Sequence, residues 1–169
     1  MIEHESNLSP SSPTSQEESA SNVLPPARQF DFWLGEWDLT WADGGRGTNS
    51  IQAILDGHVI LENFDADPAG SFRGMSFSVY DPAQNQWQQT WVDNQGGYLD
   101  LVGTYQNDTM ILTRQAMTAG KAVMQRMIFY NISTSQLDWD WQRSEDEGRT
   151  WKTLWHIHYQ RKSSPEKQA

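Results

Sequence analysis

The chain has 169 residues, a net charge of −10 and nine Trp, and Cys is absent. Without Cys there are no disulfides or zinc–thiolate sites, and the acidic charge disfavours nucleic acids and anionic membrane surfaces as partners. The sequence shows no signal-peptide pattern and no apolar run of transmembrane length, so we expect a soluble cytoplasmic protein. Because apolar residues make up only 37% of the chain, large aromatic side chains must supply much of the core.

The N-terminal segment is rich in Ser and Pro and contains no aromatic side chain. Such a segment buries too little apolar surface to offset the entropy of ordering, so residues 1–28 are predicted to be a disordered tail. One folded domain is expected at 29–162, with a frayed end at 163–169. The aromatic segment 30–34 is expected to form a short helical turn that caps one end of this domain.

Turn signals of Asp, Asn, Gly and Pro recur about every ten residues in the folded part. They separate ten candidate strands at 36–42, 48–56, 58–66, 73–81, 86–93, 98–106, 109–118, 122–132, 136–144 and 150–161. The connections are too short for crossover helices, so neighbouring strands must be antiparallel. This pattern predicts an all-β, antiparallel up-and-down barrel, which leaves no exposed sheet edge, with a two-sheet sandwich as the alternative.

Even spacing of Trp, as in Trp139-Asp140-Trp141, is typical of a strand with one apolar face. The pattern predicts inward faces carrying Trp37, Leu39 and Trp41; Met75, Phe77 and Val79; Trp87, Gln89, Trp91 and Asp93; Leu99, Leu101 and Tyr105; Leu137, Trp139 and Trp141; and Trp151, Thr153, Trp155, Ile157 and Tyr159. The strands at 58–66, 109–118 and 122–132 are apolar on both faces, so the pattern does not orient them.

Several polar side chains are predicted to be buried with these apolar faces, namely Glu62, Gln89, Asp93, Arg114 and Arg126. An isolated buried charge is costly, so we expect Glu–Arg or Asp–Arg pairs inside the barrel. Such pairs are either structural or the polar anchor of a ligand cavity lined by Trp91, Trp139 and Trp155.

His156 and His158 lie on one face of a strand, at a spacing that metal sites use. That face is opposite the Trp face, so it should point to solvent, and no third ligand is assignable. Surface histidines are therefore the favoured interpretation, with a haem or metal ligand as the weaker alternative. No cofactor is predicted.

The segment from Ser144 to Trp151 has the pattern S-x-D-x-G-x-T-W and resembles the Asp-box of sialidase propellers. In this motif Asp146 accepts backbone N–H groups, Gly148 takes a positive φ and Trp151 packs beneath the turn. A propeller would contain repeated copies. The single copy predicts a structural turn and no glycosidase activity.

The opening FDFWLGEWDL at 30–39, together with QTWVD at 89–93 and the hairpin at 138–151, resembles a family of uncharacterised bacterial proteins known as a domain of unknown function. The resemblance spans most of residues 30–161 and implies a lipocalin-like, calycin-type barrel. In such barrels a Gly-x-Trp element seals one end beneath an Arg from a late strand. Here this implies Gly35-Glu36-Trp37 with Arg126 or Arg161.

Nitrobindins, a similar ten-stranded group, bind haem through a His on the last strands. The resemblance would give that role to His156 or His158, although the nitrobindin motif around the His is not matched here and the predicted face opposes it.

We therefore expect a protein, monomeric or homodimeric, that binds a small apolar or aromatic molecule against several Trp. The polar residues expected to orient this ligand are Glu62, Gln89, Asp93 and Arg126. The alternative is an isomerase, cyclase or hydratase that uses Glu62 or Asp93 for acid–base chemistry. A structural or partner-binding protein, the third class, would need a broad exposed apolar patch.

Overall fold

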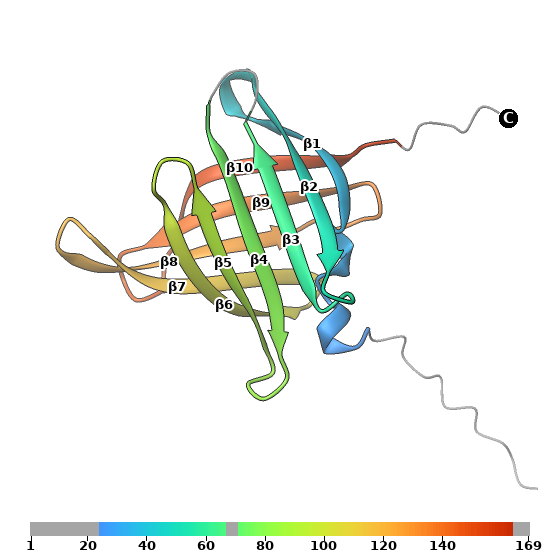
Figure 1. The fold of residues 1–169 in the computed structure, drawn as a ribbon. Coiled ribbons are helices and arrows are strands. Elements are labelled where there is room, and N and C mark those ends of the chain that lie inside the picture. Colours follow the sequence, from blue (N-terminus) through green and yellow to red (C-terminus); the bar gives the residue numbers. More distant parts are fainter. Residues whose placement is uncertain (1–23, 67–70, 164–169) are drawn as a thin grey trace, which may run out of the picture.

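The computed structural model describes residues 24–66 and 71–163. Within them the chain forms ten strands: β1 (Gly35–Trp41), β2 (Gly45–Ile54), β3 (Val59–Asp65), β4 (Arg73–Asp81), β5 (Gln86–Asp93), β6 (Tyr98–Gln106), β7 (Thr109–Thr118), β8 (Lys121–Tyr130), β9 (Gln136–Ser144) and β10 (Lys152–Arg161). Strands adjacent in sequence pair antiparallel, and β1 also pairs with β10, so the sheet closes (Figure 1). The predicted all-β barrel is confirmed, and the sandwich is excluded. No helix in this part of the chain is long and apolar enough to cross a membrane.

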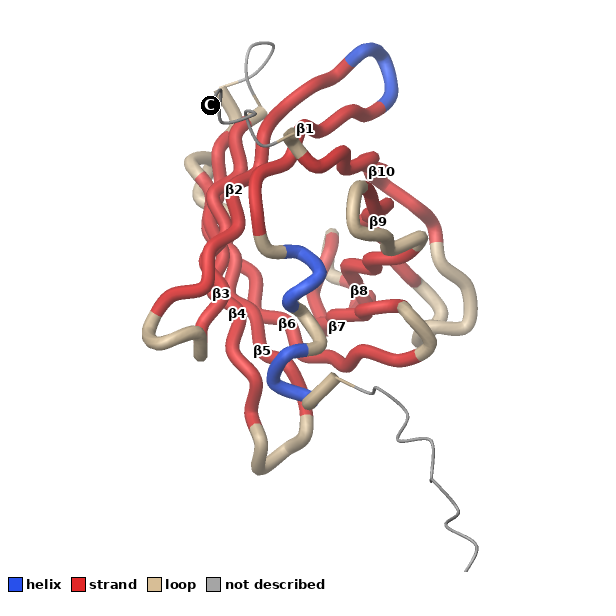
Figure 2. Tube along the Cα trace, turned by 90° about the vertical axis from the view of Figure 1, so that its right-hand side faces the viewer, coloured by secondary structure: helices blue, strands red, loops and turns tan. Residues whose placement is uncertain are grey.

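Two short 3-10 turns, η1 (Pro26–Arg28) and η2 (Asp31–Trp33), precede β1 and lie across one end of the barrel (Figure 2). The rings of Phe30 and Trp33 are fully buried and stack with centroids 5.0 Å apart. Both rings make edge contacts with Phe129. The predicted helical cap is therefore confirmed. Most of the predicted disordered tail lies outside the described residues. A third turn, η3 (Ala42–Gly44), connects β1 to β2.

The side chain of Arg161 fastens the seam between the first and last strands. Its guanidinium carbon lies 4.1 Å from the ring centroid of Trp37. It donates hydrogen bonds to three backbone carbonyls, those of Phe32, Leu34 and Thr134. A Cβ on Gly35 would lie 2.4 Å from this guanidinium, so the close approach requires glycine. The predicted seal over Trp37 is present, and Arg161, not Arg126, provides it.

The predicted inward faces of β1, β5, β6 and β9 are correct. Their buried apolar side chains are Trp37, Leu39, Trp87, Leu101, Leu137 and Trp139. On the strands that the sequence pattern did not orient, the buried residues are Ile60, Glu62, Phe64, Met110, Leu112, Val123, Met127 and Phe129.

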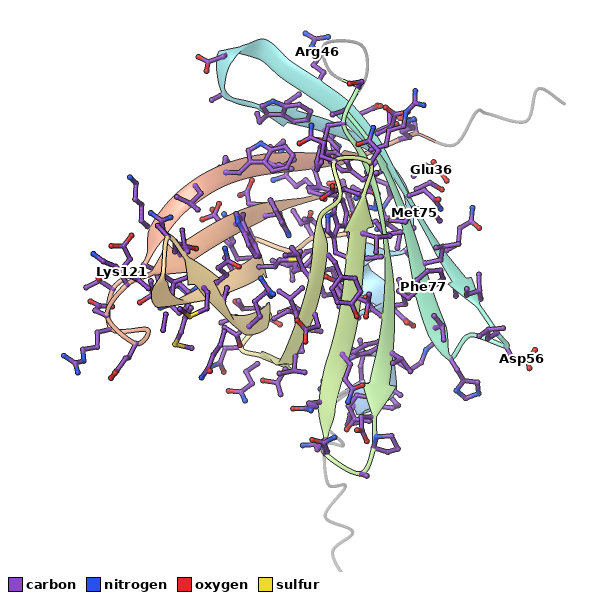
Figure 3. The ribbon with its side chains drawn as sticks, turned by 60° about the vertical axis from the view of Figure 1, so that its left-hand side comes forward. Glu36, Arg46, Asp56, Met75, Phe77 and Lys121 are labelled. Atoms are coloured by element: carbon purple, nitrogen blue, oxygen red, sulfur yellow. The ribbon has the colours of Figure 1, made fainter. Side chains whose placement is uncertain are left out.

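The predicted face of β4 is wrong. Met75, Phe77 and Val79 are 39%, 47% and 40% exposed and project from the outer surface, as Figure 3 shows for the first two. The inward residues are instead Gly74, Ser76 and Ser78. Long side chains from the neighbouring strands lie across β4 inside the barrel, and they leave room only for small residues. A Cβ on Gly74 would lie 2.0 Å from the indole of Trp91.

The prediction for the start of β10 is also wrong. The pairing register with β9 shifts between Thr153 and Trp155, which indicates a β-bulge. The bulge reverses the alternation, so Thr153 bonds to Gln142 on the outer surface while Trp155 points inward. Trp151, predicted to be inside, packs outside the barrel beneath Arg126.

Candidate functional site

A cavity of about 320 Å³ lies inside the barrel, and nine of its fifteen lining residues are aromatic. Five of these are Trp33, Trp91, Trp139, Trp141 and Trp155. Trp33 belongs to the helical cap and is 1% exposed, so the capped end forms the floor of the cavity. Half-buried lining residues such as Trp91 and Trp141 form the mouth.

The aromatic rings of the wall hold one another at steep angles. Trp155 meets Trp139 at 90° and Phe64 at 83°, each with ring centroids 5.8 Å apart. Phe64 also contacts Trp91 edge to face at 6.0 Å. Such edge-to-face pairs stabilise the arrangement of the rings, so the wall is held in place before any ligand arrives.

Glu62 on β3 supplies a carboxyl group to the wall, and its side chain is almost completely buried. Its Oε1 accepts a hydrogen bond from Asn49 Nδ2 at 2.7 Å, and its Oε2 accepts one from Ser76 Oγ at 2.5 Å. Burial raises the pKa of Glu62 to about 7, although both hydrogen bonds oppose the change. No cationic side chain of the described residues pairs with it, so the expected Glu–Arg pair is wrong for Glu62.

Tyr159 on β10 lies beside this carboxyl group. Its hydroxyl oxygen accepts a hydrogen bond from Asn49 Nδ2 at 3.2 Å. Burial, reinforced by the charge of Glu62, raises the pKa of Tyr159 well above its ordinary value. The phenol is therefore neutral at physiological pH. Asn49, which lies on β2, thus donates hydrogen bonds to both acidic groups.

Asp93 lies at the end of β5, near the mouth of the cavity. Its Oδ1 accepts hydrogen bonds from the backbone N–H groups of Gln95 at 2.9 Å and Gly97 at 2.8 Å. Its Oδ2 accepts one from Trp91 Nε1 at 3.0 Å. Burial alone would raise the pKa of Asp93, but these hydrogen bonds outweigh it and lower the pKa below the ordinary value. Asp93 is thus ionised and also fixes the orientation of Trp91.

The structure brings five of the seven predicted site residues to the cavity wall: Glu62, Trp91, Asp93, Trp139 and Trp155. Gln89 is buried behind the wall, where its Nε2 donates to Ser78 Oγ at 2.9 Å. Arg126 does not reach the cavity. It lies on the outer surface, 4.0 Å from the Trp151 ring, and its Nε donates to Gln142.

Sequence reasoning missed other lining residues, among them Phe64, Phe72, Gln125 and Trp141. A signal existed for Trp141, since it shares a strand face with Trp139. The pattern of β3 is apolar on both sides and could not place Phe64, and nothing in the sequence marked Asn49.

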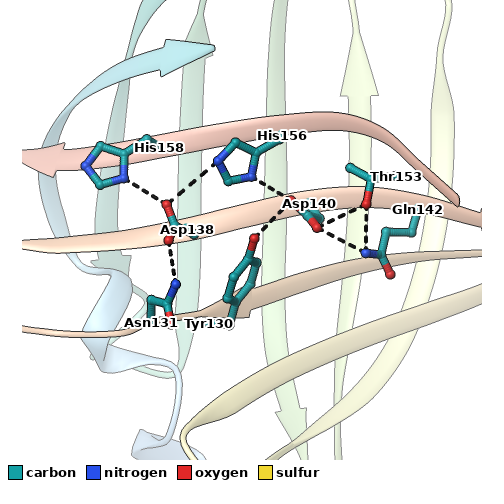
Figure 4. A network of polar contacts seen from close by, with 8 residues as sticks. All are labelled: Tyr130, Asn131, Asp138, Asp140, Gln142, Thr153, His156 and His158. Carbon is teal, nitrogen blue, oxygen red and sulfur yellow. Dashed lines mark hydrogen bonds and ion pairs between the residues drawn. The ribbon is translucent and has the colours of Figure 1, made fainter. Parts of the chain in front are cut away.

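His156 and His158 lie on the outer surface of β10, as predicted. The Nδ1 atoms face Asp140 Oδ1 at 2.7 Å and Asp138 Oδ1 at 2.8 Å, within the polar network of Figure 4. The residue between them, Ile157, points inward, so neither imidazole reaches the cavity. Among residues 24–66 and 71–163, no three His, Asp or Glu side chains are arranged to hold a metal ion.

The predicted structural turn between β9 and β10 is present. Asp146 accepts hydrogen bonds from the backbone N–H of Thr150 at 2.8 Å and from its hydroxyl at 2.6 Å. With a further bond from Ser144, these contacts lower the pKa of Asp146 to about 2. Gly148 has a φ of +84°, and Trp151 Nε1 donates to its carbonyl. The turn lies outside the cavity lining.

These features define a class of protein, a closed ten-stranded antiparallel barrel with an aromatic-lined interior. Within that class, the chain belongs to the family described as protein of unknown function DUF1579, which it matches over residues 33–161. The match begins at the helical cap and ends at the sealing Arg161, so it covers the whole barrel. A comparison with curated proteins finds no match. The predicted membership of an uncharacterised family is confirmed, and a closer relation to lipocalins stays a prediction.

Proposed function

We propose that this protein binds a small apolar or aromatic molecule in the cavity of its barrel. The observation that carries the proposal is the cavity of about 320 Å³ with an aromatic wall and a buried carboxyl group facing into it. Size and lining are those of typical small-molecule sites, in which a few polar groups orient a ligand held by apolar contacts. A barrel core selected only for stability would gain by replacing Glu62, because a buried carboxyl group without a cation is costly.

In this proposal the indole rings supply contact area, and Glu62 and Asp93 orient the ligand from the two ends of the cavity. Gln89 supports the wall from behind, and Arg126 takes no part because its guanidinium lies outside. A cytoplasmic location and a monomeric or homodimeric state stay predictions.

The test is a titration of intrinsic Trp fluorescence with a neutral hydrophobic dye, combined with native mass spectrometry of molecules that co-purify. Trp155→Leu removes a ring from the cavity wall, and we expect it to weaken dye binding about tenfold. Trp151→Leu is the matched control, because this indole lies outside the barrel. Circular dichroism verifies that both variants fold. Equal effects of the two substitutions, or no binding by the wild type, would contradict the proposal.

A second candidate function is acid–base catalysis in the same cavity. The observation in its favour is that the two carboxyl groups of the cavity wall differ in pKa. The pKa of Glu62 is raised to about 7, whereas that of Asp93 is lowered. A group with a pKa near the working pH is suited to proton transfer. The test is incubation of a co-purifying molecule in D₂O. Deuterium incorporation by the wild type and not by Glu62→Gln supports catalysis, and equal incorporation rejects it.

A further inference from the structure

The charges around the cavity have one sign. Its two charged lining residues are Glu62 and Asp93, and no Lys, Arg or His stands among the fifteen lining residues that the structure describes. The two arginines that the sequence pattern predicted to be buried do not line the cavity. Arg114 donates to Gln125 and lies 3.6 Å from Asp100, and Arg126 lies on the outer surface. An ionised Glu62 therefore faces a cavity whose described lining carries no cationic side chain.

The groups that contact Glu62 do not neutralise it. Asn49 and Ser76 donate one hydrogen bond each to its two oxygens, but both donors are uncharged. A carboxylate has about four lone-pair sites, so two donors leave capacity for a further partner. The two hydrogen bonds offset part of the cost of burying the charge, and a cation within contact distance would offset more of it.

The aromatic wall of the cavity also favours a cation. The face of an indole ring is electron-rich and attracts cations, and Trp is the best side chain for this contact. Trp155 stands at 90° to Trp139 and packs against Phe64, which in turn meets Trp91. Rings at such angles present their faces in different directions, an arrangement that aromatic cages use to hold ammonium groups.

We propose that the ligand of this cavity is an organic cation, an amine or quaternary ammonium compound whose charged nitrogen lies against the Trp rings and is balanced by Glu62. The inference rests on the proposed binding function and adds the charge of the ligand. An anionic ligand, such as a fatty acid, would bring a like charge toward Glu62 and Asp93 at low dielectric, where repulsion is strong.

The proposal predicts that the affinity for a cation depends on pH. Burial raises the pKa of Glu62 to about 7, so the carboxylate that balances the cation forms as the pH rises through this value. The neighbours of Glu62 from β2 and β4, Asn49 and Ser76, do not titrate. Tyr159 from β10 stays neutral and Asp93 from β5 stays ionised, because their pKa values are raised and lowered respectively. Affinity for a cation should therefore rise between about pH 6 and about pH 8, and affinity for a neutral molecule should not.

The experiment uses three small molecules of nearly the same shape. Choline is the cation, dimethylbutanol is its neutral isostere with carbon in place of nitrogen, and dimethylbutanoate is the corresponding anion. Calorimetric titration of the full chain at about pH 8 should show choline binding about tenfold more tightly than dimethylbutanol, with no binding of the anion. Glu62→Gln should abolish the preference for choline. Glu36→Gln should preserve it, because Glu36 accepts from Ser50 Oγ in a similar way but lies on the outer surface (Figure 3).

The outcomes separate this inference from the proposed function. Two outcomes contradict a cationic ligand but leave the proposed binding function intact. They are binding of the neutral dye without binding of choline, and equal affinity for choline and dimethylbutanol. Failure of both the dye and choline to bind overturns both proposals. If Glu62→Gln does not fold, the choline affinity of the wild type is compared at about pH 6 and about pH 8. Equal affinity at the two pH values contradicts the role of Glu62.

Discussion

Replacing the buried carboxyl group of Glu62 by an amide, Glu62→Gln, should make the barrel more stable near neutral pH. The wild-type side chain is 5% exposed and has no cationic partner among the described residues. Its pKa rises from 4.5 in the unfolded chain to about 7 in the native state. Between these values the native state holds a proton that the unfolded chain has released. The resulting stability is complete below pH 4.5 and is lost as the pH rises through about 7.

The size of the loss follows from the two pKa values. The difference between 4.5 and about 7 corresponds to about 3 kcal/mol of unfolding free energy, at about 1.4 kcal/mol for each pH unit. An amide does not titrate, so the variant avoids this loss. The site can also accept the new N–H group of the amide. Asn49 Oδ1 is buried without a hydrogen-bond partner, and rotation of the Asn49 amide would turn this oxygen toward the new N–H group.

Urea unfolding of both proteins at about pH 5 and about pH 8 measures the effect. We expect Glu62→Gln to exceed the wild type by up to about 3 kcal/mol at the higher pH and to lose most of that advantage at the lower pH. The two proteins differ only at position 62, so the difference between them isolates Glu62. Glu36→Gln serves as the control. A difference in stability that does not change with pH would refute the reasoning.

Three further substitutions test other parts of the structure. Arg161→Lys should lower the unfolding free energy by about 2 kcal/mol in urea, because an ammonium group cannot both stack on Trp37 and donate to three carbonyls; an unchanged value would disprove the seal. Gly74→Ala should displace Trp91, alter the fluorescence spectrum and weaken dye binding about tenfold, since the methyl group would lie 2.0 Å from the indole; an unaltered spectrum would argue against this packing. Phe77→Ser should cost about 1 kcal/mol or less because the ring is 47% exposed, whereas a cost near 4 kcal/mol would place it in the core.

The strands were predictable because their limits depend on local chemistry. Asn107 and Asp108 both adopt positive φ between β6 and β7, a conformation that these residue types tolerate better than most. The alternation of Trp139 and Trp141 gave the inward face of β9 in the same way, since adjacent side chains on a strand point to opposite sides.

The orientation of β4 could not be predicted from its own residues. The pattern offers two faces, one with Phe77 and one with Ser76, and the larger apolar side chain is the natural choice for the core. Which face is inward depends on the space that side chains of β3 and β5 occupy, and that is a property of the closed barrel. The bulge after Thr153 is a second case, because one extra residue reverses the alternation without a mark in the sequence.

The candidate site was predictable in part. Even spacing led to Trp91, Trp139 and Trp155, and a charge within a buried strand singled out Glu62. The partners of Glu62 could not be predicted from the sequence. Asn49 and Ser76 come from other strands, and the register of those strands is known only once the barrel is closed. General electrostatics favoured an Arg as partner, and the structure provides neutral donors instead.

The contacts of Arg161 bear on how the domain is completed during synthesis. The carbonyls of Phe32 and Leu34 that it binds precede it by 129 and 127 positions. The ribosome thus delivers Arg161 only after the other nine strands, and the ring of strands stays open until β10 has been made. A nascent chain that ends before β10 presents unpaired edges at β1 and β9, which are the surfaces that chaperones must shield from other strands.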